Sequence, residues 1–157
     1  MFKIEIWEDN PILRKISEEI KEKDLKDVIP LWKKMVKFLK DKDNWWVWLA
    51  APQIWKNIRM VAVWLPKDRD DENYKVIMMI NPEILENNWD KDYIDVEWCL
   101  SLPKAKRVDI PRYSRIKVSF IDENKKKKTL IITWLAAKVV QHEIDHLDWI
   151  LFTDYVK

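Results

Sequence analysis

The chain has 157 residues, with 29 lysines and arginines against 27 aspartates and glutamates, so its net charge is only +2. This length fits one domain, residues 1–157, with a core of its own, and the balanced charge excludes a strong attraction to nucleic acid or membranes. No stretch has the roughly 20 apolar residues of a membrane span and the start is unlike a signal peptide, so we expect a cytoplasmic protein.

The first third of the chain predicts a strand and a helix. Residues 1–6 alternate apolar and polar side chains as a strand does. A helix is expected over residues 31–42, with Pro30 suited to its first turn, where a missing N–H costs nothing. The same pattern also allows a longer helix that begins near Asp24 and is kinked at Pro30.

The rest of the chain predicts strands followed by one more helix. Strands are expected at residues 59–65 and 75–80, and residues 115–122 and 127–133 alternate as an antiparallel hairpin around a turn rich in lysine. Residues 134–148 form the last expected helix. This order of elements predicts an α+β fold, with antiparallel β-sheets packed around the C-terminal helix.

The last expected helix carries His142, Glu143 and His146 in an H-E-x-x-H arrangement. Positions i and i+4 lie on one helix face, so both imidazoles can reach one metal ion with the carboxylate beside it. These are the only two histidines of the chain, in a segment whose apolar spacing predicts burial, where such groups are costly unless they are paired or bind metal. The alternative is a chance spacing on a solvated helix. We interpret the motif as a hydrolytic metal centre.

A centre of this kind usually has three protein ligands and one open position. Phe152 stands where some H-E-x-x-H proteases have a third histidine, and only Asp148 and Asp154 follow the helix as other candidates. The third ligand is therefore expected upstream, where the single cysteine, Cys99, is the conspicuous candidate. Without a secretory leader a lone cysteine is interpreted as a reduced thiol, although such a residue can also be a small buried apolar side chain.

Four segments resemble the sequence motifs of peptide deformylases. Residues 48–53 (WLAAPQ) resemble G-L-A-A-P-Q, residues 97–101 (EWCLS) resemble E-G-C-L-S, residues 141–147 (QHEIDHL) match the third motif, and residues 10–14 are similar to the N-terminal segment. Their order and spacing agree over essentially the whole chain. The resemblance implies an α+β hydrolase that removes the N-formyl group from the formyl-methionine of nascent polypeptides, a co-translational step of protein biosynthesis.

The same resemblance implies roles for individual residues. Glu143 would take a proton from water and return it to the leaving amine. The side-chain amide of Gln53 and the backbone N–H of Leu100 would stabilise the oxyanion. The implied metal ligands are Cys99, His142 and His146. The implied metal is Fe(II), with Zn(II), Ni(II) or Co(II) as substitutes.

The substrate pocket is also assigned by resemblance. Val47, Leu135 and Val139 would surround the methionine side chain, although Leu135 and Val139 could equally be ordinary core residues. The backbone near Val47 and Trp98 would pair with the extended substrate as an added strand. The expected partners are formyl-methionyl nascent peptides and, transiently, the ribosome.

The chain departs from the family in having no glycine and 11 tryptophans. Average composition predicts roughly 11 glycines in this length. Three tryptophans, Trp7, Trp55 and Trp89, lie in turn-like contexts. Five others fall where the family pattern has glycine: Trp46, Trp48, Trp98, Trp134 and Trp149.

Two explanations of these tryptophans compete. Either the indoles are real and fill the substrate groove, or they are glycines decoded as tryptophan under the wrong genetic code. We favour the second, because a folded domain without glycine lacks the usual turn chemistry. Besides a deformylase, the sequence allows an H-E-x-x-H metallopeptidase without Cys99 as a ligand, or a catalytically impaired scaffold if the indoles are real.

Overall fold

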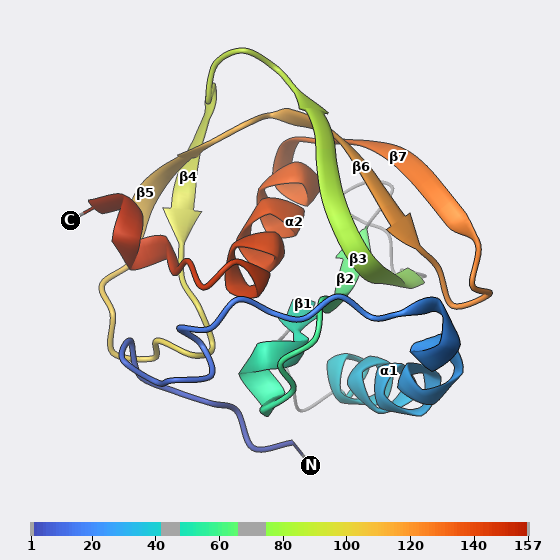
Figure 1. The fold of residues 1–157 in the computed structure, drawn as a ribbon. Helices are drawn as coiled ribbons and strands as arrows, with labels where there is room; N and C mark the ends of the chain where they lie inside the picture. The colour runs from blue at the N-terminus through green and yellow to red at the C-terminus, as the bar shows by residue number, and fades with distance from the viewer. Residues whose placement is uncertain (1, 42–47, 66–74, 157) are drawn as a thin grey trace.

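The computed structural model describes residues 2–41, 48–65 and 75–156 (Figure 1). The strands are β1 (Trp48–Ala50), β2 (Met60–Leu65), β3 (Lys75–Asn87), β4 (Tyr93–Glu97), β5 (Val108–Arg112), β6 (Arg115–Ile121) and β7 (Lys127–Thr133). The helices are α1 (Leu25–Leu39) and α2 (Trp134–Leu147), and the short 3-10 helices are η1 (Glu22–Asp24), η2 (Ala51–Ile54) and η3 (Phe152–Val156). One antiparallel sheet has the order β1-β2-β3-β6-β7, and a second pairs β4 with β5. The expected α+β class with antiparallel sheets around the C-terminal helix is confirmed.

The larger sheet is covered on both faces. Along β2, Val61 and Val63 belong to the core that the sheet forms with α2. Met60 and Ala62 point the other way, into the core formed with α1. Because side chains alternate between the faces of a strand, a strand covered on both sides has a continuous apolar sequence, as β2 does.

Helix α2 lies between the two sheets, with β4 and β5 on one side and the larger sheet on the other (Figure 1). Ten of its fourteen residues are buried, including polar ones. Gln141 ties the helix to the loop between β5 and β6, since its Nε2 donates to the Tyr113 carbonyl at 2.8 Å and its Oε1 accepts from the Tyr113 N–H at 3.1 Å. This helix is the rigid support on which the histidines stand.

The hairpin expected around the lysine turn is present. β6 and β7 pair from Arg115 opposite Thr133 to Ile121 opposite Lys127. Oδ1 of Asp122 accepts hydrogen bonds from the backbone N–H groups of Asn124 and Lys126, at 2.9 and 2.8 Å, and these bonds organise the turn.

Four features differ from the expectations. Helix α1 begins at Leu25 with Pro30 inside it, so the longer alternative applies; Pro30 is exposed, and packing of Met35 and Leu39 outweighs the lost hydrogen bond. Strand β3 was expected to end at residue 80 but continues to Asn87. Its pairing with β6 shifts register on both sides of Glu83, and proline is tolerated at such irregularities. The apolar alternation that predicts a strand is interrupted there. Strands β1, β4 and β5 were not predicted, because each has five residues or fewer.

The expected N-terminal strand was wrong in its described part, residues 2–6, which form no strand. Phe2 and Ile4 pack beside the α1 core, which explains the apolar alternation, while the backbone bonds to loops: Glu5 N–H donates to the Gln53 carbonyl at 2.8 Å.

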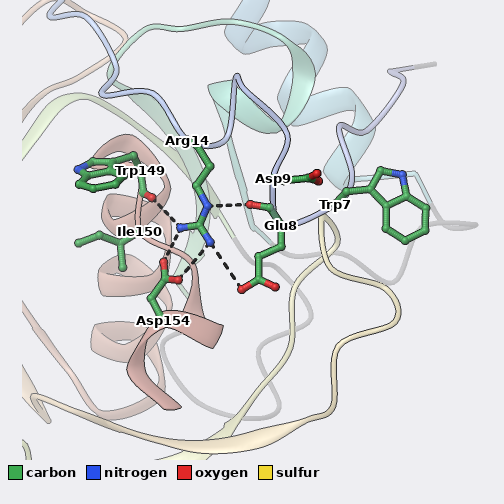
Figure 2. A pocket seen from close by; sticks show the side chains of 7 residues that line it. All are labelled: Trp7, Glu8, Asp9, Arg14, Trp149, Ile150 and Asp154. Carbon is green, nitrogen blue, oxygen red and sulfur yellow. Dashed lines mark hydrogen bonds and ion pairs between the residues drawn. The ribbon is translucent and has the colours of Figure 1, made fainter. Parts of the chain in front are cut away.

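The N-terminal segment is tied to the C-terminal one by Arg14 (Figure 2). Its guanidinium forms an ion pair with Asp154 and donates to the backbone carbonyls of Glu8 at 2.7 Å and Trp149 at 3.1 Å.

None of the described helices has the length and hydrophobicity that crossing a bilayer requires.

Candidate metal centre

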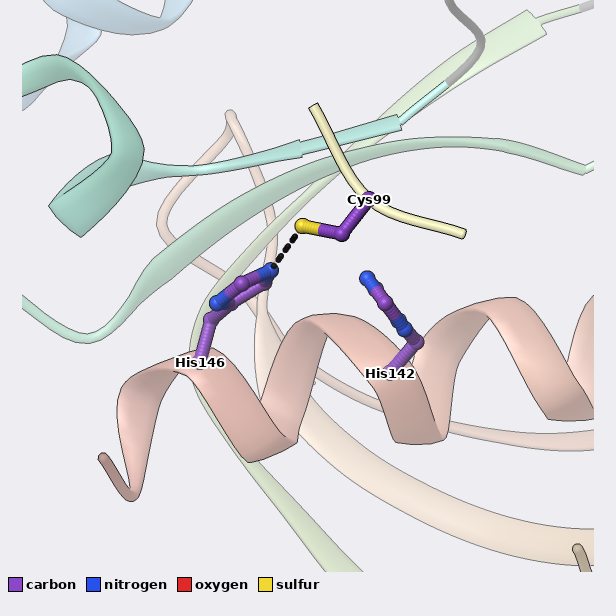
Figure 3. A group of neighbouring side chains, drawn as sticks. All are labelled: Cys99, His142 and His146. Carbon is purple, nitrogen blue, oxygen red and sulfur yellow. Dashed lines mark hydrogen bonds between the residues drawn. The ribbon is translucent and has the colours of Figure 1, made fainter. Parts of the chain in front are cut away.

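Three potential ligand side chains meet above helix α2 (Figure 3). His142 and His146 lie one turn apart, with ring centroids 5.0 Å from each other and planes at 85°. Cys99 comes from the loop after β4, and its Sγ lies 3.1 Å from Nε2 of His146. The sulfur and the two ring nitrogens all lie within 4.8 Å of one another, and all three residues are buried. In the described part of the chain the structure thus brings together the three ligands expected from the sequence.

The loop that carries Cys99 is held in place from several sides. Leu102 N–H donates to the Cys99 carbonyl at 3.0 Å, and Ser101 N–H points at Sγ from 3.4 Å. On the strand before the loop, the Val96 carbonyl accepts a hydrogen bond from Nζ of Lys138 on α2 at 2.6 Å. These contacts fix the sulfur over the helix.

Unpaired nitrogen atoms at this centre fit a metal ion. Nδ1 of His142 lies 2.8 Å from Oε2 of Glu97; an ionised carboxylate only accepts, so Nδ1 carries a proton and Nε2 is the nitrogen that can bind a metal ion once the imidazole is neutral. That Nε2 is buried and has no hydrogen-bond partner among the described residues. One thiol and two imidazoles form a donor set that suits zinc or Fe(II).

The charges at the centre favour metal binding as well. Burial raises the pKa of the Cys99 thiol, but the imidazole groups of His146 and His142 outweigh it and hold that pKa well below its usual value. Burial also tends to raise the pKa of Glu97. The hydrogen bonds that Glu97 accepts from His142 and Arg112 together outweigh this effect and lower its pKa to about 2. A thiolate is the form that binds metal, and an ionised Glu97 orients the imidazole of His142.

Glu143 lies beside the ligands with its carboxyl group fully buried. Neither carboxylate oxygen has a hydrogen-bond partner among the described residues. Burial raises the pKa of Glu143 to about 7, because the lost hydration outweighs the lowering effect of the nearby His146 and His142 imidazoles. A buried acid with a pKa near neutrality and no structural partner can transfer protons.

A buried ionic network stands behind His142. Nε and Nη2 of Arg112 donate to the two oxygens of Glu97 at 2.7 and 3.1 Å, and Nη1 donates to Asp145 at 2.6 Å. The hydroxyl of Tyr155 donates to Asp145 at 3.0 Å, and its ring lies 4.7 Å from the Arg112 guanidinium carbon. One guanidinium therefore pairs with two carboxylates, Glu97 from β4 and Asp145 from α2.

The sequence analysis missed Arg112 and Tyr155. Glu97 and Asp145 belong to the recognised motifs, so a buried carboxylate needing a cation could have been inferred, but nothing local distinguishes Arg112 from the other basic residues. Its role depends on the pairing of β4 with β5, in which Val108 lies opposite Glu97.

The oxyanion candidates lie beside the sulfur. Gln53, in η2, is buried; its Oε1 accepts from Ala50 N–H at 2.9 Å, and its Nε2 lies 3.6 Å from the sulfur of Cys99 and 3.2 Å from Oγ of Ser101. The amide of Leu100 follows directly after Cys99 in the chain. Both donors thus stand next to the ligand group.

The residues assigned to the substrate pocket are only partly brought together. Trp98 and the buried Val139 line a cavity of about 30 Å³ beside His142, together with Trp48. Leu135 lies one turn before Val139 on α2 and is 42% exposed. Val47 lies outside the described residues, as does Trp46.

Comparison with known proteins gives the same family throughout. The sequence model of the family described as polypeptide deformylase matches residues 1–157. A peptide deformylase of Desulfotalea psychrophila is 35% identical over 147 residues, which cover 94% of this chain and 83% of that protein.

Two solved structures are similar over nearly the whole chain. A probable peptide deformylase of Synechococcus phage S-SSM7 has a TM-score of 0.84 and 35% identity, with 99% of both chains covered. A class I type b peptide deformylase of Acinetobacter baumannii, bound to Met-Ala-Ser, has a TM-score of 0.82 and 25% identity, with 99% of this chain and 98% of that one covered. The chain therefore belongs to the polypeptide deformylase family, whose members are metal-dependent hydrolases that remove the N-formyl group from nascent peptides.

Proposed function

We propose that residues 1–157 act as one domain that deformylates nascent polypeptides through a metal ion bound by Cys99, His142 and His146. One observation carries this proposal: a thiol and two imidazoles converge beside the buried carboxyl group of Glu143, which has no hydrogen-bond partner among the described residues. The Acinetobacter baumannii structure holds Met-Ala-Ser, the kind of peptide that such a reaction would release.

Family membership supports Fe(II) as the cellular metal, with Zn(II), Ni(II) or Co(II) able to replace it, and one thiol with two imidazoles can hold each of these ions. The bound ion would act as a Lewis acid on the formyl group and would make water a better nucleophile. The chain's own task is to hold the ligands in position, which the pair of His142 with Glu97 and the loop around Cys99 do.

Glu143 supplies the proton transfer in this proposal. Its raised pKa, about 7, lets the carboxylate accept a proton from the attacking water at neutral pH and return it to the leaving amine. The nitrogen leaves as a neutral amine with that proton, and formate leaves with the hydroxyl oxygen. Because neither carboxylate oxygen has a hydrogen-bond partner among the described residues, the carboxyl group is available for both transfers.

The oxyanion that forms during attack would accept hydrogen bonds from Nε2 of Gln53 and from the N–H of Leu100. The amide of Gln53 is already oriented by the bond from Ala50 N–H to its oxygen, so the nitrogen faces the site. Each such donor contributes roughly 3 kcal/mol to the transition state in comparable sites.

The substrate would lie along β1, which is an edge strand of the larger sheet. An extended peptide can add to such an edge through main-chain hydrogen bonds, with backbone near Val47 and Trp98 on either side. The methionine side chain would contact Val139, Leu135 and Val47. The nascent chain would be met in the cytoplasm, in transient contact with the ribosome.

The test is hydrolysis of formyl-Met-Ala-Ser by protein loaded anaerobically with Fe(II), followed as formate release. Acetyl-Met-Ala-Ser and an internal peptide of the same composition are the matched controls. We expect formate from the first substrate only. Cleavage of the internal peptide without formate release would replace this proposal by a metallopeptidase.

A further inference from the structure

We propose that Trp7, Trp55, Trp134 and Trp149 stand at positions where the working protein has glycine, and that glycine at Trp48 and Trp98 opens the substrate groove that their indoles fill. The first part rests on backbone geometry alone. The second part rests on the proposed function, because it concerns the site of the formyl peptide.

Left-handed backbone conformations coincide with tryptophan in this chain. Among the described residues, six have a positive φ, and four of them are tryptophans: Trp7 (86°), Trp55 (63°), Trp134 (54°) and Trp149 (62°). A bulky side chain is a clear outlier in this region, whereas glycine enters it without steric cost. Tryptophan makes up 11 of 157 residues, so chance does not concentrate it at these positions.

Two of the four lie at helix ends that require such a residue. Trp149 follows α2, and Ile150 N–H donates back to the Asp145 carbonyl at 2.9 Å. Trp55 follows η2, where Lys56 N–H donates to the Ala51 carbonyl at 3.0 Å. This bond across five residues closes a helix through one left-handed residue, which is usually glycine.

The structure uses the backbones of these residues more than their indoles. The Trp149 carbonyl accepts from Arg14, Trp7 N–H donates to the Ser101 carbonyl at 2.9 Å, and Trp134 N–H donates to the Ser114 carbonyl at 2.6 Å. Figure 2 shows the indoles of Trp7 and Trp149 directed away from Arg14. All four residues are 48–62% exposed, so glycine would keep the backbone bonds and remove only surface contacts, such as those of Trp134 with Tyr93 and of Trp7 with Lys104.

Trp48 and Trp98 present a different problem, at the metal centre. Their rings lie 6.2 Å apart at an interplanar angle of 47°, one on the edge strand β1 and the other next to Cys99. The cavity they line with His142 and Val139 measures about 30 Å³, enough for about one water molecule. Pockets for small ligands are commonly about 300–1,000 Å³, so a methionine side chain does not fit beside these indoles.

Variants of the chain as written test the backbone part. Glycine in place of any one of the four tryptophans with positive φ should raise the Tm by about 2–4 °C, because the strain of a bulky residue in a left-handed backbone conformation is removed. The four variants are Trp7→Gly, Trp55→Gly, Trp134→Gly and Trp149→Gly. Trp89→Gly is the exposed control without positive φ and should leave the Tm unchanged; Trp32→Gly, inside α1, should lower it. A fall in Tm for the four would overturn the assignment.

Peptide binding tests the groove part. In the Glu143→Gln background, Trp48→Gly with Trp98→Gly should tighten calorimetric binding of formyl-Met-Ala-Ser by about tenfold or more, the gain of burying a methionine side chain. The same pair changed to Phe keeps bulky rings and should show no gain. Unchanged affinity in the double glycine variant, with metal still bound, would overturn the blocked groove.

The two proposals fail separately. A rise in Tm without formyl-peptide hydrolysis in any metal-loaded variant would sink the proposed function and leave the glycine assignment standing. Peptide mass mapping of the protein from its native organism decides the assignment directly. Glycine masses at positions 7, 48, 55, 98, 134 and 149 are expected, and indole-containing masses there would overturn it.

Discussion

Nδ1 of His142 lies 2.8 Å from Oε2 of Glu97, and the same carboxylate is held by two bonds from Arg112. The imidazole is therefore oriented by a charge that is itself fixed by a buried cation. These contacts connect His142 on α2 to the β4–β5 sheet, so the geometry of the candidate metal site depends on the helix and on that sheet.

Replacing Glu97 with Gln should weaken metal binding by about 10–100-fold, the usual effect of removing a carboxylate behind a histidine ligand. The amide can still accept from His142 but carries no charge. Competition with a chromogenic chelator measures the change. The control is Glu86→Gln, which removes a surface ion pair with Lys117 and should leave metal binding normal. Equal metal affinities in the two variants would show that Glu97 does not support the metal site.

The stability of the metal-free protein should fall in acid because of Glu97. Its folded pKa, about 2, lies below the ordinary 4.5, so the ionised group stabilises the fold fully above pH 4.5 and loses this effect as the pH falls toward 2. The contribution is on the order of 3 kcal/mol. Urea unfolding between pH 6 and pH 3, a range chosen to span the ordinary pKa, should show a flatter profile for Glu97→Gln. Parallel profiles would contradict the shift.

Arg112→Met should destabilise the protein by about 3–5 kcal/mol, because two carboxylates would remain buried without their cation. Urea unfolding at neutral pH measures the loss. Lys117→Met removes a partly exposed partner of Glu86 instead and should cost about 1 kcal/mol or less. If the two variants lost equal stability, the buried network would have no special role.

Glu143→Gln should keep the metal and lower kcat/KM for formyl-Met-Ala-Ser by about 10²–10⁴-fold, since the ligands remain but proton transfer is lost. Metal content and formate release are measured on the same sample. Near-normal turnover with full metal occupancy would assign proton transfer to another group.

Cys99→Ala should lose both bound metal and activity, because two histidines alone hold the ion weakly. Metal stoichiometry by elemental analysis gives the result. In a metallopeptidase with another third ligand, the same variant would retain its metal. The far-ultraviolet circular dichroism spectrum of the variant shows whether any loss is due to unfolding.

Local patterns in the sequence were sufficient for much of the fold. The spacing of His142 and His146 placed both on one face of α2, and the alternation of residues 115–133 predicted the β6–β7 hairpin. These features depend on neighbours within a few positions, so periodicity encodes them directly. The proposed ligands and the family also follow from short motifs, which the structure places side by side.

Tertiary packing alone decided the rest. Cys99 and His146 are 47 positions apart, and only the placement of the β4 loop over α2 brings sulfur and nitrogen to 3.1 Å. Arg112 has no local signature, and its partners come from two different elements. Helix α1 begins at Leu25 because the burial of its apolar side chains outweighs the backbone hydrogen bond that Pro30 cannot donate. Such contacts depend on sheet pairing and on burial across the whole chain, which no short segment of sequence contains. The composition showed that the chain has no glycine, and the positive φ angles of the structure then located four tryptophan positions that favour glycine.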